Sequence, residues 1–461
     1  MRNVKKLIVI GLSLLVILTW QKSALADAEV QSGDKIQLDG NVKLIRSGKV
    51  VGALPKHAVV HFIHFDEGKT RIELAGATYL IDSQQVSVTN KPLSFVPVNK
   101  AVYPLEIVAK KATTVVDRNG VVLKTLKKGD KLTLRGVNEA KGLVDYLTSA
   151  AQIELADFKH SNLVNGAKKI TYTEMEYKLQ VIAAMYPAIT KLDEIGQSVE
   201  GRNLYALTLG TGKKHILLDA SFHGREHMTT NVLMEMIDTY VLHYVNDTKM
   251  NGYNVNKLLQ NVSIVFVPMV NPDGVTLAQG GEMKTNRAKL IKINDGSTNF
   301  DRWKANANGV DLNRQFDVNW HLIKKTKPSF KGYKGTTVFT EPEAVAMKRL
   351  IDKGDYLAYV SYHSSGQIIY WSQAKTQFAR TKKLVKGVSN ITGYKVMPVT
   401  KPNEPFAASE DYFTKTKDRP AMTVEIAPFA GEASVPLKQW ANVWKRNATV
   451  GLYAASEASK W

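Results

Sequence analysis

Between residues 40 and 157 the chain is patterned as short strands separated by turns. Apolar and polar positions alternate in runs such as KLTLRGV, and Gly, Asn and Asp mark the breaks between the runs. The pattern repeats weakly at an offset of 72 residues. The matching pairs are Gly48 and Gly120, Leu54 and Leu126, Lys56 and Lys128, and Ile81 and Ile153. We therefore predict two small all-β barrels, over residues 38–95 and 105–160.

After the second predicted barrel, longer apolar runs alternate with helical stretches. Met175, Leu179, Ile182 and Tyr186 recur at helical spacing. The runs HILLDASF, VSIVFVPMV, YLAYVSYHS and AMTVEIAPF are apolar almost throughout, and helical patterns such as TTNVLMEMIDTYVLHYV and PEAVAMKRLIDKG lie among them. Strands that are apolar on both faces are typical of a sheet covered by helices on both sides. We predict an α/β domain over residues 168–461.

The first 26 residues have the pattern of an export signal. The basic segment MRNVKK precedes an apolar run of 14 residues, and the small-x-small cleavage site Ala24-Leu25-Ala26 follows. A retained membrane anchor is the alternative, but a spanning helix needs ~20 apolar residues. We predict a signal peptide over residues 1–26, a secreted mature protein and no stable membrane span after cleavage. The chain has no cysteine, so the exported folds are expected to stand without disulfides.

The amino-acid composition gives the chain a strong positive charge. The formal net charge is +20, and the predicted leader holds four of the basic residues and no acids, which leaves +16 on the mature chain. Such an excess favours a polyanionic partner. For an exported protein this indicates an anionic wall polymer or lipid rather than nucleic acid, and no stacking platform or recognition helix is evident. Because the lysines are scattered, a generally cationic surface is the alternative.

Candidate chemistry lies where two predicted strands end. The turn HGRE contains His223 and Glu226, and His363 follows another apolar run. A hydrolytic zinc site typically takes three protein ligands and keeps a fourth position for water, although HxxE alone is more often a structural turn. Glu425 lies inside the apolar run AMTVEIAPF, where a buried carboxylate is costly unless it is paired or functional. Next to zinc it could take a proton from the attacking water and pass it to the leaving amine.

Five segments in order, FHGREH, VPMVNPDG, GVDLNRQF, SYHS and VEIAPF, resemble the motifs of the zinc carboxypeptidase family. The resemblance covers residues 168–461. It implies an α/β/α fold around a mixed eight-stranded sheet, with one zinc ion per chain. It also implies that His223, Glu226 and His363 are the zinc ligands and that Glu425 is the catalytic glutamate.

The resemblance further implies a set of substrate contacts. Asn313 and Arg314 match the pair that grips a terminal carboxylate, and a guanidinium fork suits that planar anion. Arg225 matches a position that contacts substrate in many relatives, and His227 is interpreted as a bystander or a supporting residue. Glu410 matches a specificity position that is acidic in relatives preferring basic side chains, where it could meet an ammonium group. The alternative for this residue is an exposed helix-capping glutamate.

Two positions depart from the family pattern. The family usually has an arginine that stabilises the oxyanion, and here the segment RWKANANGV places Lys304 at that position with Arg302 two residues before it. Lysine can still present a positive charge there, and the sequence leaves open which of the two acts. No tyrosine aligns with the one that closes over substrate. Tyr412 belongs to the following helix or strand, and Phe406 is a candidate replacement.

The two predicted barrels resemble the bacterial SH3-like modules that flank wall-degrading enzymes, which implies wall binding. Together with the leader and the peptidase motifs, they make the chain similar to the γ-D-glutamyl-diaminopimelate peptidase branch of the family. This resemblance implies a secreted, cell-wall-associated zinc metallopeptidase that acts on peptidoglycan stem peptides. The alternatives are a general metallocarboxypeptidase that trims ordinary peptides, and a non-catalytic wall-binding protein.

Overall fold

The computed structural model describes residues 30–74, 77–94, 96–97, 103–138, 140–146, 149–372, 374–399, 404–405 and 407–461. The predicted signal peptide lies outside these residues. The chain divides into two compact units, one ending at His160 and the other comprising Ser161–Trp461. Across the described ranges, no helix combines the length and the apolar character that crossing a membrane requires.

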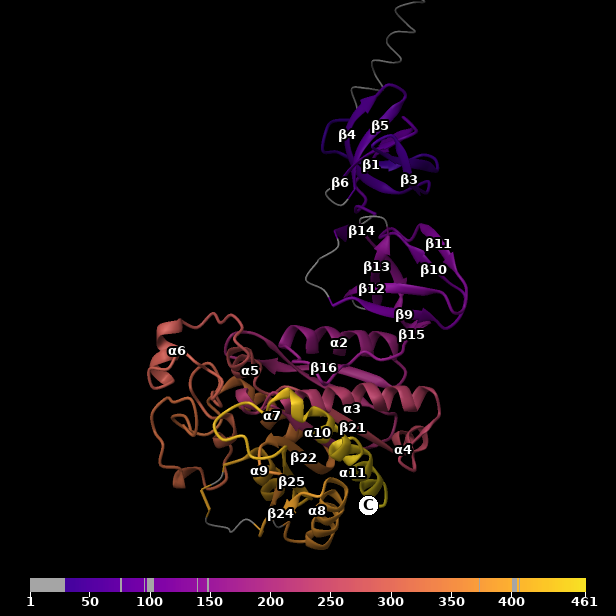
Figure 1. Ribbon diagram of the computed structural model, residues 1–461. Helices are drawn as coiled ribbons and strands as arrows, with labels where there is room; N and C mark the ends of the chain where they lie inside the picture. Colours follow the sequence, from indigo (N-terminus) through magenta and orange to yellow (C-terminus); the bar gives the residue numbers. More distant parts are fainter. Residues whose placement is uncertain are drawn as a thin grey trace, which may run out of the picture. The chain divides into compact units, whose positions relative to one another are not determined.

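The first seven strands of the N-terminal unit form one antiparallel sheet (Figure 1). They are β1 (Lys35–Leu38), β2 (Val42–Arg46), β3 (Lys49–Leu54), β4 (Val59–Asp66), β5 (Lys69–Leu74), β6 (Ala77–Ile81) and β7 (Val86–Val88). Their order in the sheet is β3-β2-β6-β5-β4-β1-β7. Alternation along the strands directs side chains such as Ile36, Leu44, Ile72 and Ile81 into a common core, where each is fully buried.

A second sheet follows in the same unit. Its strands are β8 (Val96–Pro97), β9 (Leu105–Ala109), β10 (Thr113–Val116), β11 (Val122–Leu126), β12 (Lys131–Asn138), β13 (Lys141–Tyr146), β14 (Ser149–Glu154) and β15 (Phe158–His160), with a 3-10 turn, η1 (Leu155–Asp157), before the last. The order β11-β10-β14-β13-β12-β9-β15 repeats that of the first sheet strand for strand. Gly48 and Gly120 occupy equivalent hairpin turns with positive φ. The prediction of all-β modules ahead of the α/β domain is confirmed.

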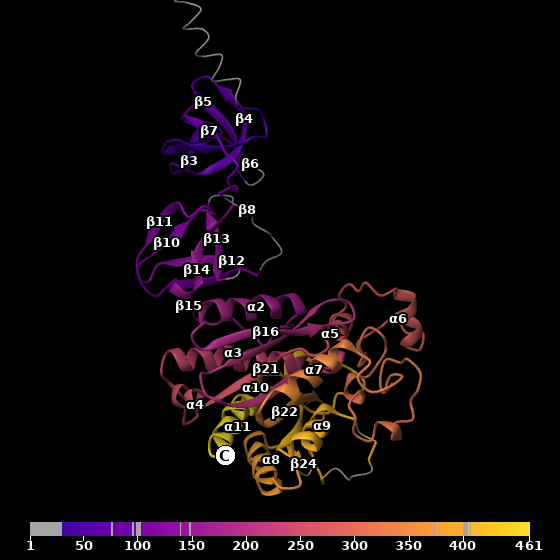
Figure 2. The same cartoon turned by 180° about the vertical axis from the view of Figure 1, so that it is seen from behind.

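The C-terminal unit alternates strands and helices (Figure 2). Its strands are β16 (Thr190–Gln197), β17 (Asn203–Leu209), β18 (Lys214–Ala220), β19 (Lys249–Met250), β20 (Tyr253–Asn254), β21 (Val262–Val267), β22 (Tyr356–Ser364), β23 (Ile368–Trp371), β24 (Lys395–Val396) and β25 (Ala421–Ile426). Its α-helices are α2 (Tyr172–Met185), α3 (Met228–Val245), α4 (Val255–Asn261), α5 (Pro272–Ala278), α6 (Arg287–Ile293), α7 (Pro342–Lys353), α8 (Phe378–Thr392), α9 (Ser409–Lys417), α10 (Trp440–Asn447) and α11 (Val450–Ser459). Short 3-10 turns complete it: η2 (Gly224–Glu226), η3 (Leu312–Arg314), η4 (Trp320–Leu322) and η5 (Leu437–Gln439).

One eight-stranded sheet organises this unit, in the order β16-β17-β21-β18-β22-β25-β23-β24. The pairs β21–β18, β18–β22, β22–β25 and β23–β24 are parallel, whereas β16–β17, β17–β21 and β23–β25 are antiparallel. The predicted mixed eight-stranded sheet is therefore confirmed.

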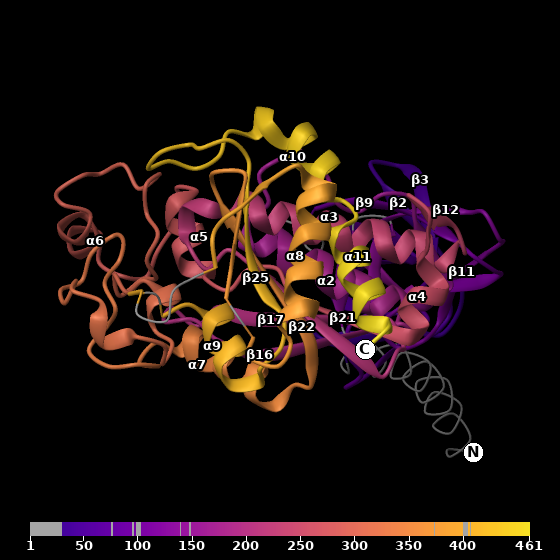
Figure 3. The same ribbon diagram turned by 90° about the horizontal axis from the view of Figure 1, so that it is seen from below.

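Helices cover both faces of this sheet, as the uniformly apolar strands predict (Figure 3). Successive residues of β18 show the two sides. Leu217 belongs to a core cluster with Met347 of α7 and Phe413 of α9. Its neighbour Leu218 faces the other way, because a side chain added at Gly451 of α11 would meet it at 3.4 Å. The parallel strands β18, β22 and β25 thus end along one edge, between two helical layers.

Candidate active site

The turn after β18 is shaped by close packing against α5. A Cβ atom at Gly224 would lie 2.3 Å from the carbonyl oxygen of Gly274, so only glycine fits there. Asn271 supports the same contact by donating its side-chain amide to the carbonyl oxygen of Phe222 at 3.0 Å. The motifs FHGREH and VPMVNPDG are therefore two halves of one packing arrangement. This arrangement holds His223 and Glu226 at the sheet edge.

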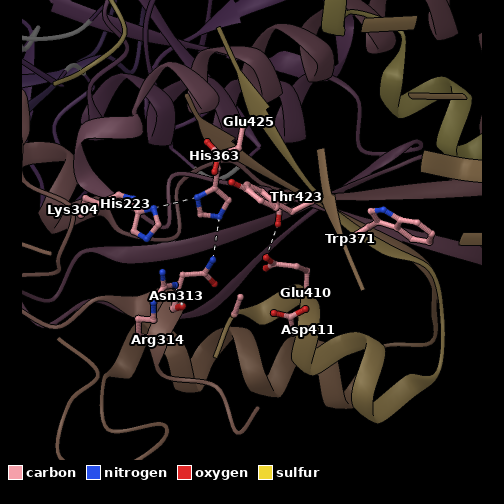
Figure 4. Close-up of a pocket in the computed structure, with 12 residues that line it drawn as sticks. His223, Lys304, Asn313, Arg314, His363, Trp371, Glu410, Asp411, Thr423 and Glu425 are labelled. Atoms are coloured by element: carbon pink, nitrogen blue, oxygen red, sulfur yellow. Dashed lines mark hydrogen bonds between the residues drawn. The ribbon is translucent and has the colours of Figure 1, made fainter. Parts of the chain in front are cut away.

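Three buried side chains, His223, Glu226 and His363, converge at this edge. Figure 4 shows the two histidines. His363, at the end of β22, places Nδ1 at 2.9 Å from Oε2 of Glu226 and 3.1 Å from Nδ1 of His223. His223 Nδ1 lies 3.0 Å from Oε1 of Glu226. One ligand atom from each residue falls within 4.8 Å of the others. Two imidazoles and one carboxylate are the donors that a catalytic zinc ion takes, so the set fits that metal.

Asp311 orients this set, and sequence reasoning missed it. Its Oδ1 accepts a hydrogen bond from Nε2 of His223 at 3.0 Å, which leaves Nδ1 of the imidazole free to bind metal. Its Oδ2 accepts a bond from the backbone N–H of Gly332 at 3.0 Å. The signal was present, because Asp311 is the acid of the GVDLNRQF motif, next to the predicted pair Asn313 and Arg314.

Acidic and basic side chains of the site shift one another's pKa values. Burial works against ionisation of Glu226, but the charges of His223 and Lys304 hold the pKa of that carboxyl well below its ordinary value. Burial likewise opposes ionisation of Asp311, yet His223 and Arg314 lower its pKa far below the ordinary range. Burial lowers the pKa of His363, but the Glu226 carboxylate outweighs it and raises that pKa to about 9. A metal ion that binds here displaces a proton.

Glu425 is brought beside the ligands by strand register. In the parallel pair β22–β25 it is the partner of His363, so the two side chains leave the sheet edge together. Burial and the neighbouring Glu226 carboxylate raise the pKa of Glu425 to about 7. A carboxyl with this pKa can both accept and donate a proton near neutral pH.

The structure separates the two candidates for the oxyanion position. Lys304 lies beside the ligands, with Nζ 3.1 Å from Oε1 of Glu226. Its segment is fixed by backbone bonds from Gly224 N to Lys304 O at 3.1 Å and from Arg225 N to Trp303 O at 2.7 Å. Arg302 instead donates to Oδ1 of Asn294 at 3.0 Å and stacks on Phe330 with its guanidinium 4.0 Å from the ring centre. Lys304 is therefore the cation that faces the site.

A cavity of about 190 Å³ opens from the ligands. Asn313 and Arg314, in η3, line one end of it together with Lys304 (Figure 4). Asn313 Nδ2 lies 3.4 Å from Nε2 of His363, and Arg314 is braced by a 2.7 Å bond from Nη1 to the carbonyl oxygen of Asn313. Arg225 turns toward the carbonyl oxygen of Arg302, with Nη1 at 3.3 Å.

Acidic and aromatic side chains line the other end of the cavity (Figure 4). Glu410 accepts hydrogen bonds from the hydroxyls of Thr423 at 2.5 Å and Ser409 at 3.2 Å. It is buried at the start of α9 rather than an exposed cap. Next to it, burial and the Glu410 charge raise the pKa of Asp411 to about 7. Asp411 and the aromatic Trp371 are lining residues that the sequence did not point to.

Of the two residues considered for closing over substrate, the structure describes only Tyr412. Tyr412 points away, because its hydroxyl donates to Oδ1 of Asp352 at 2.9 Å. Phe406 lies outside the described residues. Tyr370, on β23, lines the cavity itself. His227 is buried and has an Nδ1 atom with no hydrogen-bond partner among the described residues, and burial lowers its pKa to about 4, which suits a neutral supporting residue.

Comparisons with known proteins agree with this geometry. The family model described as "Zinc carboxypeptidase" matches residues 175–433. Gamma-D-glutamyl-L-diamino acid endopeptidase 1 of Lysinibacillus sphaericus is 32% identical over 298 residues, which are 64% of this chain and 73% of that protein. The uncharacterized protein YqgT of Bacillus subtilis is 32% identical over 308 residues, 65% of this chain and 79% of that protein. The crystal structure of thrombin activatable fibrinolysis inhibitor shares the fold, with a TM-score of 0.53 and 20% identity over 64% of this chain and 75% of that chain.

Proposed function

The chain belongs to the zinc carboxypeptidase family and is a zinc metallopeptidase, and from that premise we propose that it cleaves the γ-D-glutamyl–diaminopimelate bond of peptidoglycan stem peptides. One observation carries this proposal. The cavity has the Arg314 guanidinium at one end and the carboxyls of Glu410 and Asp411 at the other. Diaminopimelate combines carboxylates with an ammonium group, so both ends of the cavity would meet an opposite charge. The relative whose name specifies γ-D-glutamyl-L-diamino acid supports the same substrate.

Glu425 carries out both proton transfers. A zinc ion bound by His223, Glu226 and His363 would supply a Lewis acid that polarises the scissile carbonyl and lowers the pKa of water. Glu425 accepts the proton of the attacking water and delivers it to the nitrogen of the leaving diaminopimelate. Its pKa of about 7 suits both transfers at neutral pH.

The remaining side chains of the cavity bind charged groups of the substrate and orient the scissile bond. Lys304 presents its ammonium where negative charge develops on the carbonyl oxygen. Asn313 and Arg314 hold a carboxylate of the leaving residue, which fixes the scissile bond against Glu425. Glu410 and Asp411 receive the ammonium of its side chain.

We further propose that the protein is secreted and associated with the cell wall. The leader pattern of residues 1–26 supports export, and the charge of +16 that remains without it supports contact with anionic wall polymers. The two repeated all-β modules are the part of the chain proposed to make this contact.

Cleavage of three synthetic peptides tests the proposed substrate assignment. The first is L-Ala-γ-D-Glu-diaminopimelate, the second is its α-linked isomer, and the third is an ordinary peptide ending in lysine. We expect the zinc-loaded mature protein to cleave the γ-linked peptide with the highest kcat/KM, measured by mass spectrometry of the released diaminopimelate. Cleavage of the lysine peptide with the γ-linked peptide left intact would instead identify a general metallocarboxypeptidase.

A further inference from the structure

A second hollow, of about 470 Å³, adjoins the catalytic cavity. We call it the basic groove, because five cationic side chains line it: Lys304, Arg314, Lys324, Lys325 and Lys331. Lys304 and Arg314 line both hollows, so the groove begins where the catalytic cavity ends. Leu322 and Ile323 add an apolar part to its wall.

The positive charge of the groove is poorly balanced. Among the described residues that line it, Asp311 is the one carboxylate, and its oxygens are bound to His223 and to the N–H of Gly332. Within the described part of the chain, Lys324 and Lys325 form no ion pair. Lys331 pairs with Glu432, whose side chain is 48% exposed, and a pair this exposed contributes little.

The neighbouring positive charges also affect the pKa of Lys331. Burial lowers the pKa of Lys331, and the positive charges of Arg225, Lys325 and Lys304 lower it further. Lys304 pairs with Glu226 and Lys331 with the exposed Glu432, so the five cations around this open hollow have few acidic partners among the described residues, and an anion is favoured as the occupant.

The position of the groove assigns that anion to one side of the scissile bond. Lys304 and Glu410 lie at opposite ends of the catalytic cavity (Figure 4). In the proposed function Lys304 faces the scissile carbonyl oxygen and Glu410 binds the leaving residue. The basic groove shares Lys304 and Arg314 with the catalytic cavity and none of the residues that line its Glu410 end, so it is assigned to the acyl part of the substrate.

We propose that the basic groove is a subsite for a carboxylate carried by the residue that supplies the scissile carbonyl. The proposal rests on the proposed function. A glutamyl residue joined through its γ-carbonyl keeps its α-carboxylate free, close to the bond that is cut. Lys324, Lys325 and Lys331 would bind this carboxylate, and Leu322 and Ile323 would contact the aliphatic part of the acyl residue. Recognition of this group selects γ-linked over α-linked glutamyl bonds.

Two peptides that differ in one group test the subsite. One is L-Ala-γ-D-Glu-diaminopimelate, and the other carries an α-carboxamide in place of the α-carboxylate, with the same scissile bond and the same leaving residue. We expect the wild type to prefer the carboxylate peptide by about tenfold in kcat/KM, the effect of one charge-assisted contact. This preference is expected to shrink as ionic strength rises.

The variants Lys331→Ala and Lys324→Ala/Lys325→Ala are expected to abolish the preference. Lys327→Ala is the matched control, because Lys327 is an exposed lysine of the same loop that does not line the groove, and it should keep the wild-type ratio. Equal cleavage of both peptides by the wild type, or an unchanged ratio in the groove variants, would overturn the subsite and leave the proposed function standing. Failure of the wild type to cleave either peptide would contradict the proposed function itself.

Discussion

The substitution Asp311→Asn tests whether this buried carboxylate controls metal binding. Asp311 accepts three N–H groups: His223 Nε2 at 3.0 Å and Asn313 N at 3.2 Å on Oδ1, and Gly332 N at 3.0 Å on Oδ2. Asparagine offers one oxygen and one NH2 group in their place. Either orientation of the amide therefore turns a donor toward another donor.

The two orientations have different consequences. If the NH2 group faces Gly332, one buried N–H loses its acceptor, at a cost of about 1–3 kcal/mol of stability. If it faces His223, the imidazole must accept at Nε2 and carry its proton on Nδ1, the atom that faces Glu226 and His363. Removing a supporting partner of this kind typically weakens metal binding by about 10–100-fold, or about 1.4–2.7 kcal/mol.

Competition with a chromophoric chelator at neutral pH measures the zinc affinity, and circular dichroism with a thermal melt verifies the fold. Asp317→Asn is the matched control, since Asp317 is an exposed acid a few residues away. We expect the Asp311 variant to bind zinc at least about tenfold more weakly and the control to bind as the wild type does. A folded Asp311 variant with wild-type zinc affinity would refute the reasoning.

Three further predictions concern other charged groups of the C-terminal unit. Lys304→Ala should lower kcat by about 10²–10³-fold with little change in zinc content, and Lys304→Arg should restore much of it, as steady-state kinetics with metal analysis would reveal. Glu410→Gln should reduce kcat/KM for diaminopimelate peptides by about tenfold, but not for analogues lacking the side-chain ammonium, and equal losses on both would contradict the ammonium contact. Burial raises the pKa of Glu343 to about 8, so its protonated form favours the fold and stability falls as pH rises from the ordinary carboxyl value through 8. Glu343→Gln should therefore gain about 1–3 kcal/mol over the wild type at about pH 9, measured by urea unfolding, and less at about pH 5.

The sequence predicts the fold where periodicity is strong. Uniformly apolar runs such as HILLDASF predict strands buried on both faces, and the offset that matches Leu54 with Leu126 predicts the repeated β-module. Both leucines lie at the open ends of equivalent hairpins and are 1% exposed. Strand order is different, because pairing joins segments far apart in the chain. No local pattern shows that His363 and Glu425 are register partners.

The site is predictable where polar residues interrupt an apolar pattern. His223, Glu226, His363 and Glu425 all stand at or near strand ends, and all four meet at the sheet edge. Asp311 belongs to the GVDLNRQF motif, but the sequence does not show its role, which depends on a hydrogen bond to a residue 88 positions away.

The choice between Arg302 and Lys304 also requires the structure. Either cation suits an oxyanion in principle. Arg302 stacks on Phe330 and so does not face the site, and the local sequence gives no sign of that contact.

The most direct test of the account is muropeptide cleavage by wild type and Glu425→Gln, followed by mass spectrometry, with zinc content measured on the same samples. We expect about one zinc per chain in both proteins. We expect diaminopimelate-containing fragments from the wild type and a loss of at least about 10²-fold in the variant. A wild type that binds no zinc, or a zinc-loaded variant that releases the same fragments at the wild-type rate, would contradict it.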